Sequence, residues 1–394
     1  MDLNAYALDD RAPSTVERPS RTEEAAALIK TAHAERRAIV LHGGATRIGI
    51  GDAPTRYDMA LDLRGLSGIV EHSAADLVCI VRAGTTLAEL AAALLPAGQR
   101  WPVDAPDMAR ATVGGTIASA APAASRLRHQ HPRDWVIGCE AILGDGTRVR
   151  AGGRVVKNVT GYDLSRLYSG TYGSLAALTE LSLKLVAVDE AARTLRLRSD
   201  AGTLARVALE LRAALPLDGI VLATGREPSL FIRAAGRAAA VERLVRDARG
   251  RGAFEDVPET TWSSLGDRVT REAFVARLVI PPGREADVVS GDGHAYVGTG
   301  IAFVFGDRAP AELAALRERC EALGGALILE RATVEQKRAV GVWRSDRAVP
   351  SATGGQQAVQ TAAATQRAAA DRVASELKRR FDPRDVLAPG RMPV

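Results

Sequence analysis

Hydrophobic positions in the first half of the chain switch between helical spacing and the alternation of strands. Runs of apolar residues predict strands at 38–41, 59–63, 77–84 and 177–188. One helix is predicted at about 22–36, and a second follows Thr86 and Glu89, which form a capping-box pattern. Asp145-Gly146 separates two strand-like runs and predicts a hairpin. These elements predict a first half of the α+β or α/β class.

After about residue 190 a second pattern of strands and helices begins. Strands are predicted at 194–199, 219–225, 229–236, 273–280, 300–306 and 326–332. Helices are predicted at 201–214, 237–249, 310–323 and about 367–380. This order predicts one antiparallel sheet with helices on a face. The segment 346–366 contains few bulky apolar residues and is predicted to be a loop or linker.

Composition and charge narrow the function classes. The chain has 394 residues, enough for two or three domains, and a net charge of +5 that is spread along it. The arginines form no dense basic block with interleaved aromatic residues, so no nucleic-acid partner is expected. The start of the chain is acidic and lacks the apolar core of a signal peptide. No apolar run reaches the length of a transmembrane span.

The three cysteines, Cys79, Cys139 and Cys320, are far apart and form no C-x-x-C motif. The chain therefore offers no iron–sulfur or zinc framework of its own. Cys79 lies within an apolar run and is predicted to be a core residue. With no signal peptide and no transmembrane span, the chain is predicted to be cytoplasmic.

The stretch 42–51 reads HGGATRIGIG and follows the predicted strand at 38–41. A dinucleotide-binding fingerprint needs a third glycine, but Pro54 occupies that position. A P-loop needs a lysine, but Ile50 replaces it. On these residues alone, the stretch predicts either a site where backbone amides approach a ligand or a tight turn without one.

Three motifs downstream resemble one flavoprotein family. They are ATVGGTIAS at 111–119, GGRVVKNVTGYDLSRL at 152–167 and FDPRDVLAPGRM at 381–392. In this order they resemble the vanillyl-alcohol-oxidase-type flavoproteins, whose flavin-binding part is also called the PCMH-type FAD domain. Within that superfamily the chain is most similar to the FAD-binding (E) subunits of bacterial glycolate oxidases. The likeness covers about residues 1–190 and the last fifteen residues well, and the middle weakly.

The resemblance implies an α+β fold with a domain division. Residues 1–190 would form a PCMH-type FAD-binding domain of two α+β subdomains. Residues 191–345 would form a smaller cap, or substrate, domain with an antiparallel sheet. Residues 346–366 would be a loop or linker, and the C-terminal helix and tail at 367–394 would return to pack on the FAD-binding domain.

The resemblance also gives the glycine loop a ligand. The equivalent loop in the family wraps the FAD pyrophosphate with backbone amides, as a nest that needs neither a Rossmann helix nor a lysine. The matching positions are Gly43, Gly44, Ala45, Thr46 and Arg47. A second segment would lie along the ribityl chain and flavin, with the positions Thr112, Gly114, Gly115, Ala118 and Ser119. Asp107 would lie near the flavin edge, and residues around Leu178 would meet the cofactor through backbone groups.

Attachment and catalysis are also implied by the resemblance. The loop has no histidine where some relatives bond FAD covalently, so non-covalent FAD is expected, with His42 as a structural residue. Lys157 is a catalytic candidate because a lysine could stabilise an anionic reduced flavin or hold a carboxylate. The alternative for Lys157 is that its segment only packs against the FAD loop. Arg391 is a second candidate, placed by resemblance alone.

The chain departs from the family pattern near the expected reacting ring. AAPAA at 120–124 replaces a Gly-Leu-Ser-Gly-type run, and Ala176 replaces the third glycine of another motif. Near the C-terminus, Ala388 stands where the family usually has asparagine. FAD binding is therefore better supported than catalysis.

No metal site is predicted. His294 lies in GDGHAYV at 291–297, where related D-2-hydroxy-acid dehydrogenases have more than one histidine, and a single imidazole is not a metal site. A hairpin turn is the simpler interpretation of this stretch. His129 and His131 lack nearby carboxylates or cysteines and are predicted to lie in a loop beside the flavin.

Three functional hypotheses follow from the resemblance. The first is the FAD-binding subunit of a glycolate-oxidase-like complex, with a larger FAD subunit and an iron–sulfur subunit as partners. The flavin would take a hydride from the α-carbon of a small 2-hydroxy acid, or relay electrons for the partner. Any membrane association would come only through partners. The second hypothesis is a stand-alone FAD-dependent alcohol oxidoreductase, and the third is a non-catalytic subunit that binds FAD for structure.

Overall fold

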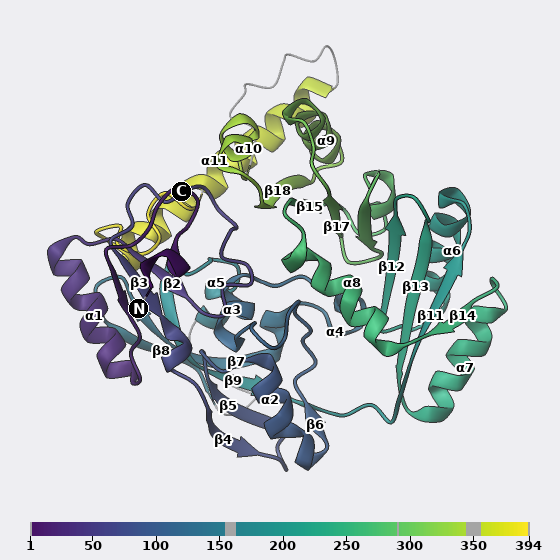
Figure 1. Cartoon of the computed structure of the whole chain (residues 1–394), viewed down its shortest axis with the longest axis horizontal. Helices are drawn as coiled ribbons and strands as arrows, with labels where there is room; N and C mark the ends of the chain where they lie inside the picture. The colour runs from purple at the N-terminus through teal and green to yellow at the C-terminus, as the bar shows by residue number, and fades with distance from the viewer. Residues whose placement is uncertain (1, 154–162, 290, 344–355, 393–394) are drawn as a thin grey trace.

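The structure is a computed structural model that describes residues 2–153, 163–289, 291–343 and 356–392. The catalytic candidate Lys157 lies outside these described residues. The chain forms an elongated molecule, with helix α1 (Thr22–Glu35) at one end and helices α6 (Ala201–Ala214) and α7 (Ala238–Arg249) at the other (Figure 1). Short 3-10 helices connect several elements: Leu3–Tyr6, Leu63–Gly65, Leu95–Ala97, Pro132–Trp135 and Glu285–Asp287.

A small parallel sheet near the N-terminus carries the glycine loop. Its strand order is β1 (Thr15–Glu17), β3 (Met59–Asp62) and β2 (Ile39–His42). Helix α1 buries Ala25, Ile29 and Ala32 in a core cluster that also holds Ile39 and Leu61 from the sheet. The predicted helix and both strands are confirmed to within a residue or two. Strand β2 ends at His42, so the glycines follow directly from a buried strand.

A five-stranded antiparallel sheet forms the second part of the N-terminal half. Its order is β4 (Ile69–Ser73), β5 (Val78–Arg82), β9 (Ala176–Lys184), β7 (Val136–Leu143) and β8 (Arg148–Gly152). Strands β6 (Gln99–Arg100) and β10 (Val186–Ala187) pair as a separate two-stranded antiparallel ribbon. The helices are α2 (Leu87–Leu94), α3 (Val113–Ala118), α4 (Arg126–His129) and α5 (Leu164–Tyr168).

Local signals in this part of the sequence were read correctly. Thr86 and Glu89 form both bonds of a capping box at α2. The predicted hairpin joins β7 to β8, and Gly146 takes the positive φ of 86° that its turn requires. Cys79 is fully buried, as predicted for a core residue.

The cap contains one eight-stranded antiparallel sheet. The strand order is β14 (Glu255–Val257), β11 (Ala191–Arg198), β13 (Ser229–Gly236), β12 (Gly219–Thr224), β16 (Gly293–Tyr296), β17 (Ile301–Phe305), β15 (Val275–Val279) and β18 (Ala326–Arg331). Helices α6, α7 and α9 (Pro310–Ala322) share one core cluster with the sheet. Helix α8 (Glu259–Arg271) shares another cluster, which also includes Ala124 of the N-terminal half. The face of the sheet that carries α8 is therefore turned towards the N-terminal half.

One prediction in the cap was wrong. The stretch 291–297 was interpreted as a hairpin turn, but Gly293–Tyr296 is strand β16, an inner strand paired with β12 and β17. The strand has only four residues, so its own apolar pattern is too short to mark it, and the neighbouring strands supply its hydrogen bonds. Helix α8 was not predicted, although its few apolar residues, Trp262, Leu265 and Val269, lie at helical spacing.

The prediction of a loop or linker at 346–366 was wrong for residues 356–366. Helix α11 runs over Gln356–Phe381, so it begins eleven residues earlier than the predicted helix at 367. The sequence there is rich in alanine and glutamine, and alanine has the highest intrinsic helix propensity. A lack of bulky apolar residues therefore removed the periodic signal without removing the helix. Residues 344–355 lie outside the described part.

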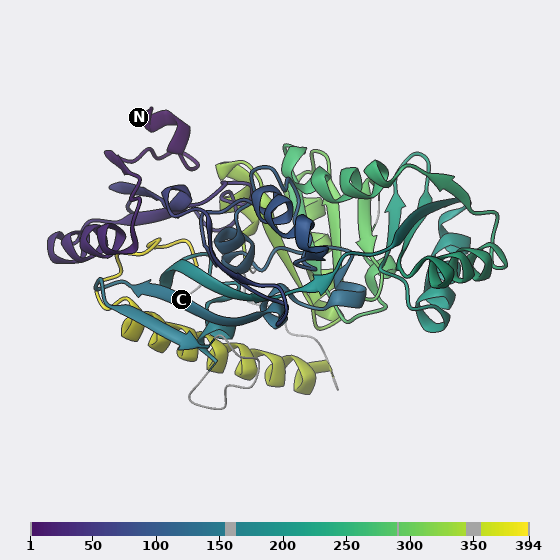
Figure 2. The same cartoon turned by 90° about the horizontal axis from the view of Figure 1, so that it is seen from below.

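The C-terminal segment returns to the N-terminal half. Helix α11 runs along the five-stranded sheet (Figure 2), and its Leu377 and Phe381 pack against the core of that sheet. The Lys378 ammonium bonds the Asp382 carboxylate at 2.6 Å. Leu387 then forms a parallel bridge with Ile39 of β2. The predicted α+β architecture with two subdomains, a cap and a returning C-terminal segment is confirmed, whereas the domain boundaries stay predictions.

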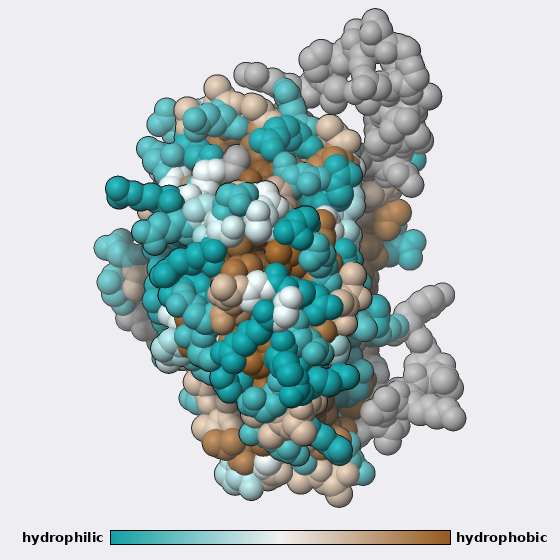
Figure 3. Space-filling model, turned by 90° about the vertical axis from the view of Figure 1, so that its right-hand side faces the viewer, coloured by the Kyte–Doolittle hydropathy of each residue, from teal (hydrophilic) through white to brown (hydrophobic). Residues whose placement is uncertain are grey.

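The cap end of the molecule has a largely hydrophilic surface (Figure 3). Arginines of β11 pair there with acids of β14, including Arg193 with Asp256 at 2.5 Å and Arg196 with Glu255 at 2.7 Å. Exposed pairs of this kind contribute little to stability, about 0–1 kcal/mol each. No described helix is long and apolar enough to cross a membrane.

Protonation of the buried His294 should make folding pH-dependent. The ring lies on β16 with 3% exposure, and burial lowers its pKa to about 4. An unfolded histidine has a pKa of about 6.5, so the unfolded chain binds more protons between these values. Stability should therefore fall as the pH drops from 6.5 towards 5, by up to about 1.4 kcal/mol per pH unit for this group.

The measurement is the thermal unfolding midpoint at several pH values between 5 and 6.5. His294→Gln should make the dependence on pH shallower. Phe305→Leu is the control, because it removes the edge-on ring contact at 5.1 Å but keeps the titrating group. This control should lower the midpoint without changing the slope, and an unchanged slope in His294→Gln would contradict the prediction.

Candidate functional site

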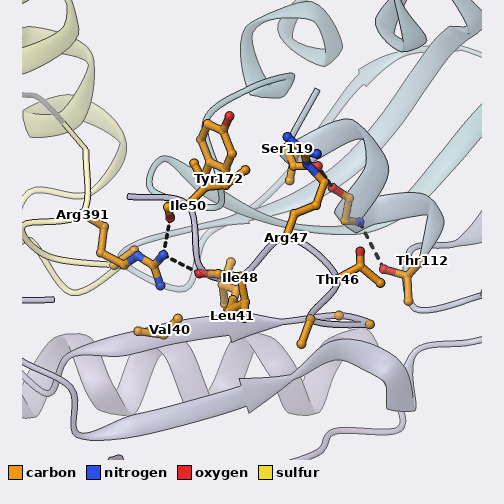
Figure 4. Close-up of a pocket in the computed structure, with 16 residues that line it drawn as sticks. Val40, Leu41, Thr46, Arg47, Ile48, Ile50, Thr112, Ser119, Tyr172 and Arg391 are labelled. Carbon is orange, nitrogen blue, oxygen red and sulfur yellow. Dashed lines mark hydrogen bonds between the residues drawn. The ribbon is translucent and has the colours of Figure 1, made fainter. Parts of the chain in front are cut away.

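A cavity lies where the glycine loop, the start of α3 and the C-terminal segment meet (Figure 4). The empty space among its lining residues is about 590 Å³, part of which is open to solvent. The lining residues are Val40, Leu41, Gly43, Gly44, Ala45, Thr46, Arg47, Ile48, Ile50, Thr112, Gly115, Ala118, Ser119, Tyr172, Ala388 and Arg391. Four segments far apart in sequence thus build a single site.

The glycine loop offers free amide groups to this cavity. The amides of Gly44, Ala45, Thr46 and Arg47 form no hydrogen bond with any described residue. Ala45 has a positive φ of 56°, as occurs in backbone nests that bind anions. A Cβ atom on Gly44 would lie 1.7 Å from the Arg110 carbonyl oxygen, so only glycine fits there. The loop therefore has the shape and the unpaired donors that a diphosphate requires.

Helix α3 forms a second wall of the cavity. The Thr112 hydroxyl caps this helix by accepting the Gly115 amide at 3.2 Å, and the Ser119 hydroxyl donates to the Gly115 carbonyl at 2.7 Å. Thr112, Gly115, Ala118 and Ser119 all line the cavity. Gly114 instead faces Ala83, the residue after strand β5, since a Cβ atom there would lie 2.7 Å from the Ala83 Cβ.

The C-terminal segment closes the cavity through Arg391. The guanidinium Nη2 donates to the Ile48 carbonyl at 2.6 Å and also to the Ile50 carbonyl. Burial lowers the pKa of Arg391, and its side chain points at the loop backbone (Figure 4). The geometry assigns Arg391 a loop-holding contact, and its predicted catalytic role stays a prediction. Trp343 donates its indole N–H to the Arg391 carbonyl at 3.0 Å.

Besides Gly114, two further predicted cofactor residues, Asp107 and Leu178, do not line the cavity. Asp107 has a φ of 56°, and its amide donates to the Asp267 carboxylate of α8 at 2.8 Å. It therefore lies at the contact between the N-terminal half and the cap. Leu178 is buried in the middle of β9, opposite Ala141 of β7. A role for these two residues in FAD binding stays a prediction.

Sequence reasoning missed Tyr172 as a cavity residue. Its φ of 51° is unusual for an aromatic residue, and its hydroxyl accepts a hydrogen bond from Arg277 of the cap at 3.0 Å. The ring lies 5.5 Å from that of Trp343. The available signal was its place between Gly170 and Gly173, since backbone outliers beside glycine-rich turns cluster at functional sites.

The histidines lie away from the cavity wall. His42 is buried, its ring nitrogen lies 2.7 Å from the Tyr57 hydroxyl, and burial lowers its pKa to about 4. His131 caps a 3-10 helix, and its pKa is lowered to about 3, first by burial. His129 belongs to α4 and pairs with Asp218 at 3.2 Å, so the predicted loop is a short helix there. Among the described residues, no group of three potential ligands could hold a metal ion.

The cavity matches the chemistry of FAD in two respects. Unpaired amides at the glycine loop suit a diphosphate, and the apolar side chains of Val40, Leu41 and Ile48 suit ring systems. No histidine or cysteine lines the cavity, so its described wall offers neither of these nucleophiles for covalent attachment.

Comparisons with known proteins agree with this geometry. A family model described as an FAD binding domain matches residues 13–152. The glycolate oxidase subunit GlcE of Escherichia coli K12 is 34% identical over 242 residues, which cover 61% of this chain and 67% of that protein. The glycolate oxidase subunit GlcD of Bacillus subtilis 168 is 32% identical over 183 residues, which cover 46% of this chain and only 39% of that protein.

A solved structure supports the fold over nearly the whole chain. Alkyldihydroxyacetonephosphate synthase superposes with a TM-score of 0.68, covering 96% of this chain and 76% of that one. Its sequence identity of 14% makes this a likeness of fold alone. The unpaired loop amides, the family match and the coverage of the GlcE relative all point to the same cofactor, FAD. The chain therefore belongs to the PCMH-type FAD-binding oxidoreductases, the family that includes the glycolate oxidase subunits.

Proposed function

We propose that the chain is the FAD-binding subunit of a glycolate-oxidase-like complex that dehydrogenates a small 2-hydroxy acid. The observation that carries this proposal is the row of unpaired amides at Gly44–Arg47, which opens into the 590 Å³ cavity. The likeness to two glycolate oxidase subunits supports the substrate class and membership of a complex. A larger FAD subunit and an iron–sulfur subunit are the proposed partners.

The residues of this chain would hold and surround the cofactor. The amides of Gly44–Arg47 would bind the diphosphate, and each bond to a charged acceptor contributes roughly 1.5–3 kcal/mol. Arg391 keeps the loop in shape by bonding the Ile48 and Ile50 carbonyls. The α3 wall from Thr112 to Ser119 would lie along the ribityl chain and keep water from the ring. When bound, FAD would supply the hydride acceptor for the α-carbon of the acid.

The catalytic contribution of this chain is a separate part of the proposal. Lys157 would stabilise negative charge near the flavin or hold a carboxylate. Electron relay for a partner subunit is the other possibility within the same complex. A cytoplasmic location fits three buried free cysteines, because cytosolic thiols stay reduced.

Two alternatives remain distinguishable. A stand-alone FAD-dependent alcohol oxidoreductase would turn over substrate without partners. A non-catalytic subunit would bind FAD for structure only, and the AAPAA stretch at 120–124 favours this alternative. Its Ala120 and Ala121 carbonyls accept bonds from Arg126 at 2.6 and 2.9 Å, so the stretch is tied to the protein itself.

The isolated chain should turn over 2-hydroxy acids poorly and should gain activity with the partner subunits. It contains no described metal or cysteine cluster that could pass single electrons onward. The test is a steady-state assay with glycolate, D-lactate and a dye acceptor, followed by anaerobic reduction watched at the flavin absorbance. A turnover of the lone chain near the enzyme median of roughly 10 per second would establish the stand-alone enzyme instead.

FAD should be released when the purified protein is precipitated with acid. No histidine or cysteine lines the cavity, so the described wall offers neither of these for attachment. The measurement compares flavin absorbance in the supernatant and in the redissolved pellet. Yellow colour that stays with the pellet would contradict non-covalent binding, and a colourless protein that takes up no added FAD would contradict the proposed function.

Gly44→Asp should lower the FAD content at least ~10-fold while leaving most of the chain folded. The new carboxylate would repel the diphosphate, and its Cβ would press on the Arg110 carbonyl at 1.7 Å. Losing one or two charge-assisted bonds of roughly 1.5–3 kcal/mol accounts for this factor. The measurement is the ratio of flavin to protein after purification.

Gly266→Asp is the matched control for this variant. Gly266 lies in helix α8 with nothing within 4 Å of an added Cβ atom, so the same substitution is tolerated there. The control should keep the wild-type FAD content and unfolding midpoint. Full FAD content in Gly44→Asp would show that the loop does not hold the diphosphate.

A further inference from the structure

Three arginines, each with at least one buried guanidinium nitrogen, lie at the junction between the cap and the cofactor cavity. We call Arg47, Arg126 and Arg277, together with Glu330 and Tyr172, the arginine cluster. Arg47 and Tyr172 line the cofactor cavity. Arg126 lines a smaller hollow with an empty volume of about 180 Å³. Arg47 and Arg126 therefore border two separate hollows, whereas Arg277 and Glu330 lie behind them and line neither.

The cap sheet presents its two cluster residues towards the N-terminal half. On β15, Ala276 and Leu278 belong to the hydrophobic core that the sheet shares with helices α6, α7 and α9. Arg277, which lies between them, therefore faces the opposite side of the sheet. On β18, the register with β15 shifts between Leu329 and Arg331, which leaves Glu330 as the extra residue of a bulge. Bulges re-aim a side chain, and this one directs the Glu330 carboxylate to the junction.

Glu330 joins two of the guanidiniums. Arg47 Nη2 donates to Glu330 Oε1 at 2.6 Å, with side chains 6% and 4% exposed. Arg277 Nε lies 3.0 Å from the same oxygen without forming a hydrogen bond to it. Arg277 Nη2 donates to the Tyr172 hydroxyl at 3.0 Å. Together these contacts link the glycine loop, the cavity wall and the cap.

The positive charge of the cluster exceeds its negative charge. Among the described residues, Glu330 is the only carboxylate that pairs with any of the three guanidiniums. The nitrogen atoms Arg47 Nε, Arg47 Nη1 and Arg126 Nε are buried and form no hydrogen bond with a described residue, and Arg277 Nε has only its ion contact with Glu330. Unpaired buried donors on charged groups are costly, so such a set indicates a missing anion.

The pKa of Arg126 reflects both its burial and the positive charge around it. It is lowered to about 9, first by burial and then by the charges of Arg277 and Arg47. Arg126 also donates to the Ala120 and Ala121 carbonyls, which fixes its guanidinium in place. A negative group between the arginines would relieve this repulsion.

We propose that the arginine cluster binds the carboxylate of the organic acid on which the protein acts, at the junction of the cap and the cofactor cavity. The assignment rests on the proposed function for the identity of the acid. The unpaired guanidinium N–H groups would donate to the two carboxylate oxygens, a geometry for which arginine is suited. The diphosphate has its own donors in the loop amides, so the cluster is left for a second anion.

The experiment uses the FAD-loaded full chain and oxalate, a stable dianion that carries no hydride to donate. Oxalate should perturb the flavin absorbance spectrum saturably, whereas neutral glycolamide should not. Arg277→Met should weaken the oxalate affinity at least ~10-fold, which is about 1.4 kcal/mol. Arg277→Lys should keep part of the affinity. Arg206→Met, on the exposed surface of α6, is the matched control and should bind oxalate as the wild type does.

Each outcome decides the proposal. Unchanged oxalate affinity in Arg277→Met overturns it, as does a wild-type protein whose spectrum and unfolding midpoint ignore oxalate. Loss of FAD from Arg277→Met would assign the cluster to the cofactor and overturn the substrate role. If the chain takes up no FAD at all, the proposed function fails separately. The midpoint of the FAD-free protein with and without oxalate then still tests the anion site.

Discussion

The bond between Arg391 and the glycine loop is the constraint on which the site depends. Two loop carbonyls, those of Ile48 and Ile50, accept from a guanidinium 343 and 341 residues away in sequence. The same C-terminal segment pairs Leu387 with Ile39, at the strand that leads into the loop. In the same loop, the four amides of Gly44–Arg47 form no hydrogen bond with a described residue and are available to a ligand. The cavity wall is therefore built from segments near both ends of the chain.

Much of this fold could be predicted from local pattern, because strands and helices of ordinary length carry their own periodicity. The glycine loop could also be recognised as a site, since Gly44 permits an approach that no other residue allows. Strand β16 was missed because four residues are too few for a pattern. The start of α11 was missed because its alanines stabilise a helix without marking an apolar face.

The cap side of the site could not be predicted, for a physical reason. Arg277 and Glu330 belong to neighbouring strands, and the sequence of neither strand shows which of its faces lies towards the cavity. The bulge that turns Glu330 towards Arg47 is a property of strand pairing, which depends on the whole sheet. The Tyr172 hydroxyl likewise accepts its hydrogen bond from Arg277, a residue 105 positions away. Long-range pairs of this kind leave no trace in a local window.

The Arg47–Glu330 pair also gives the cap a share in cofactor binding. Arg47 belongs to the loop that would hold the diphosphate, yet its guanidinium is held by a carboxylate of the cap sheet. Breaking one partner of a buried pair leaves an uncompensated charge, at a cost of about 3–5 kcal/mol. The cap is thus coupled to the loop electrostatically as well as by packing. An acid bound beside Glu330 would change the electrostatic environment of the loop through Arg47. Binding at the two sites would therefore be coupled in free energy.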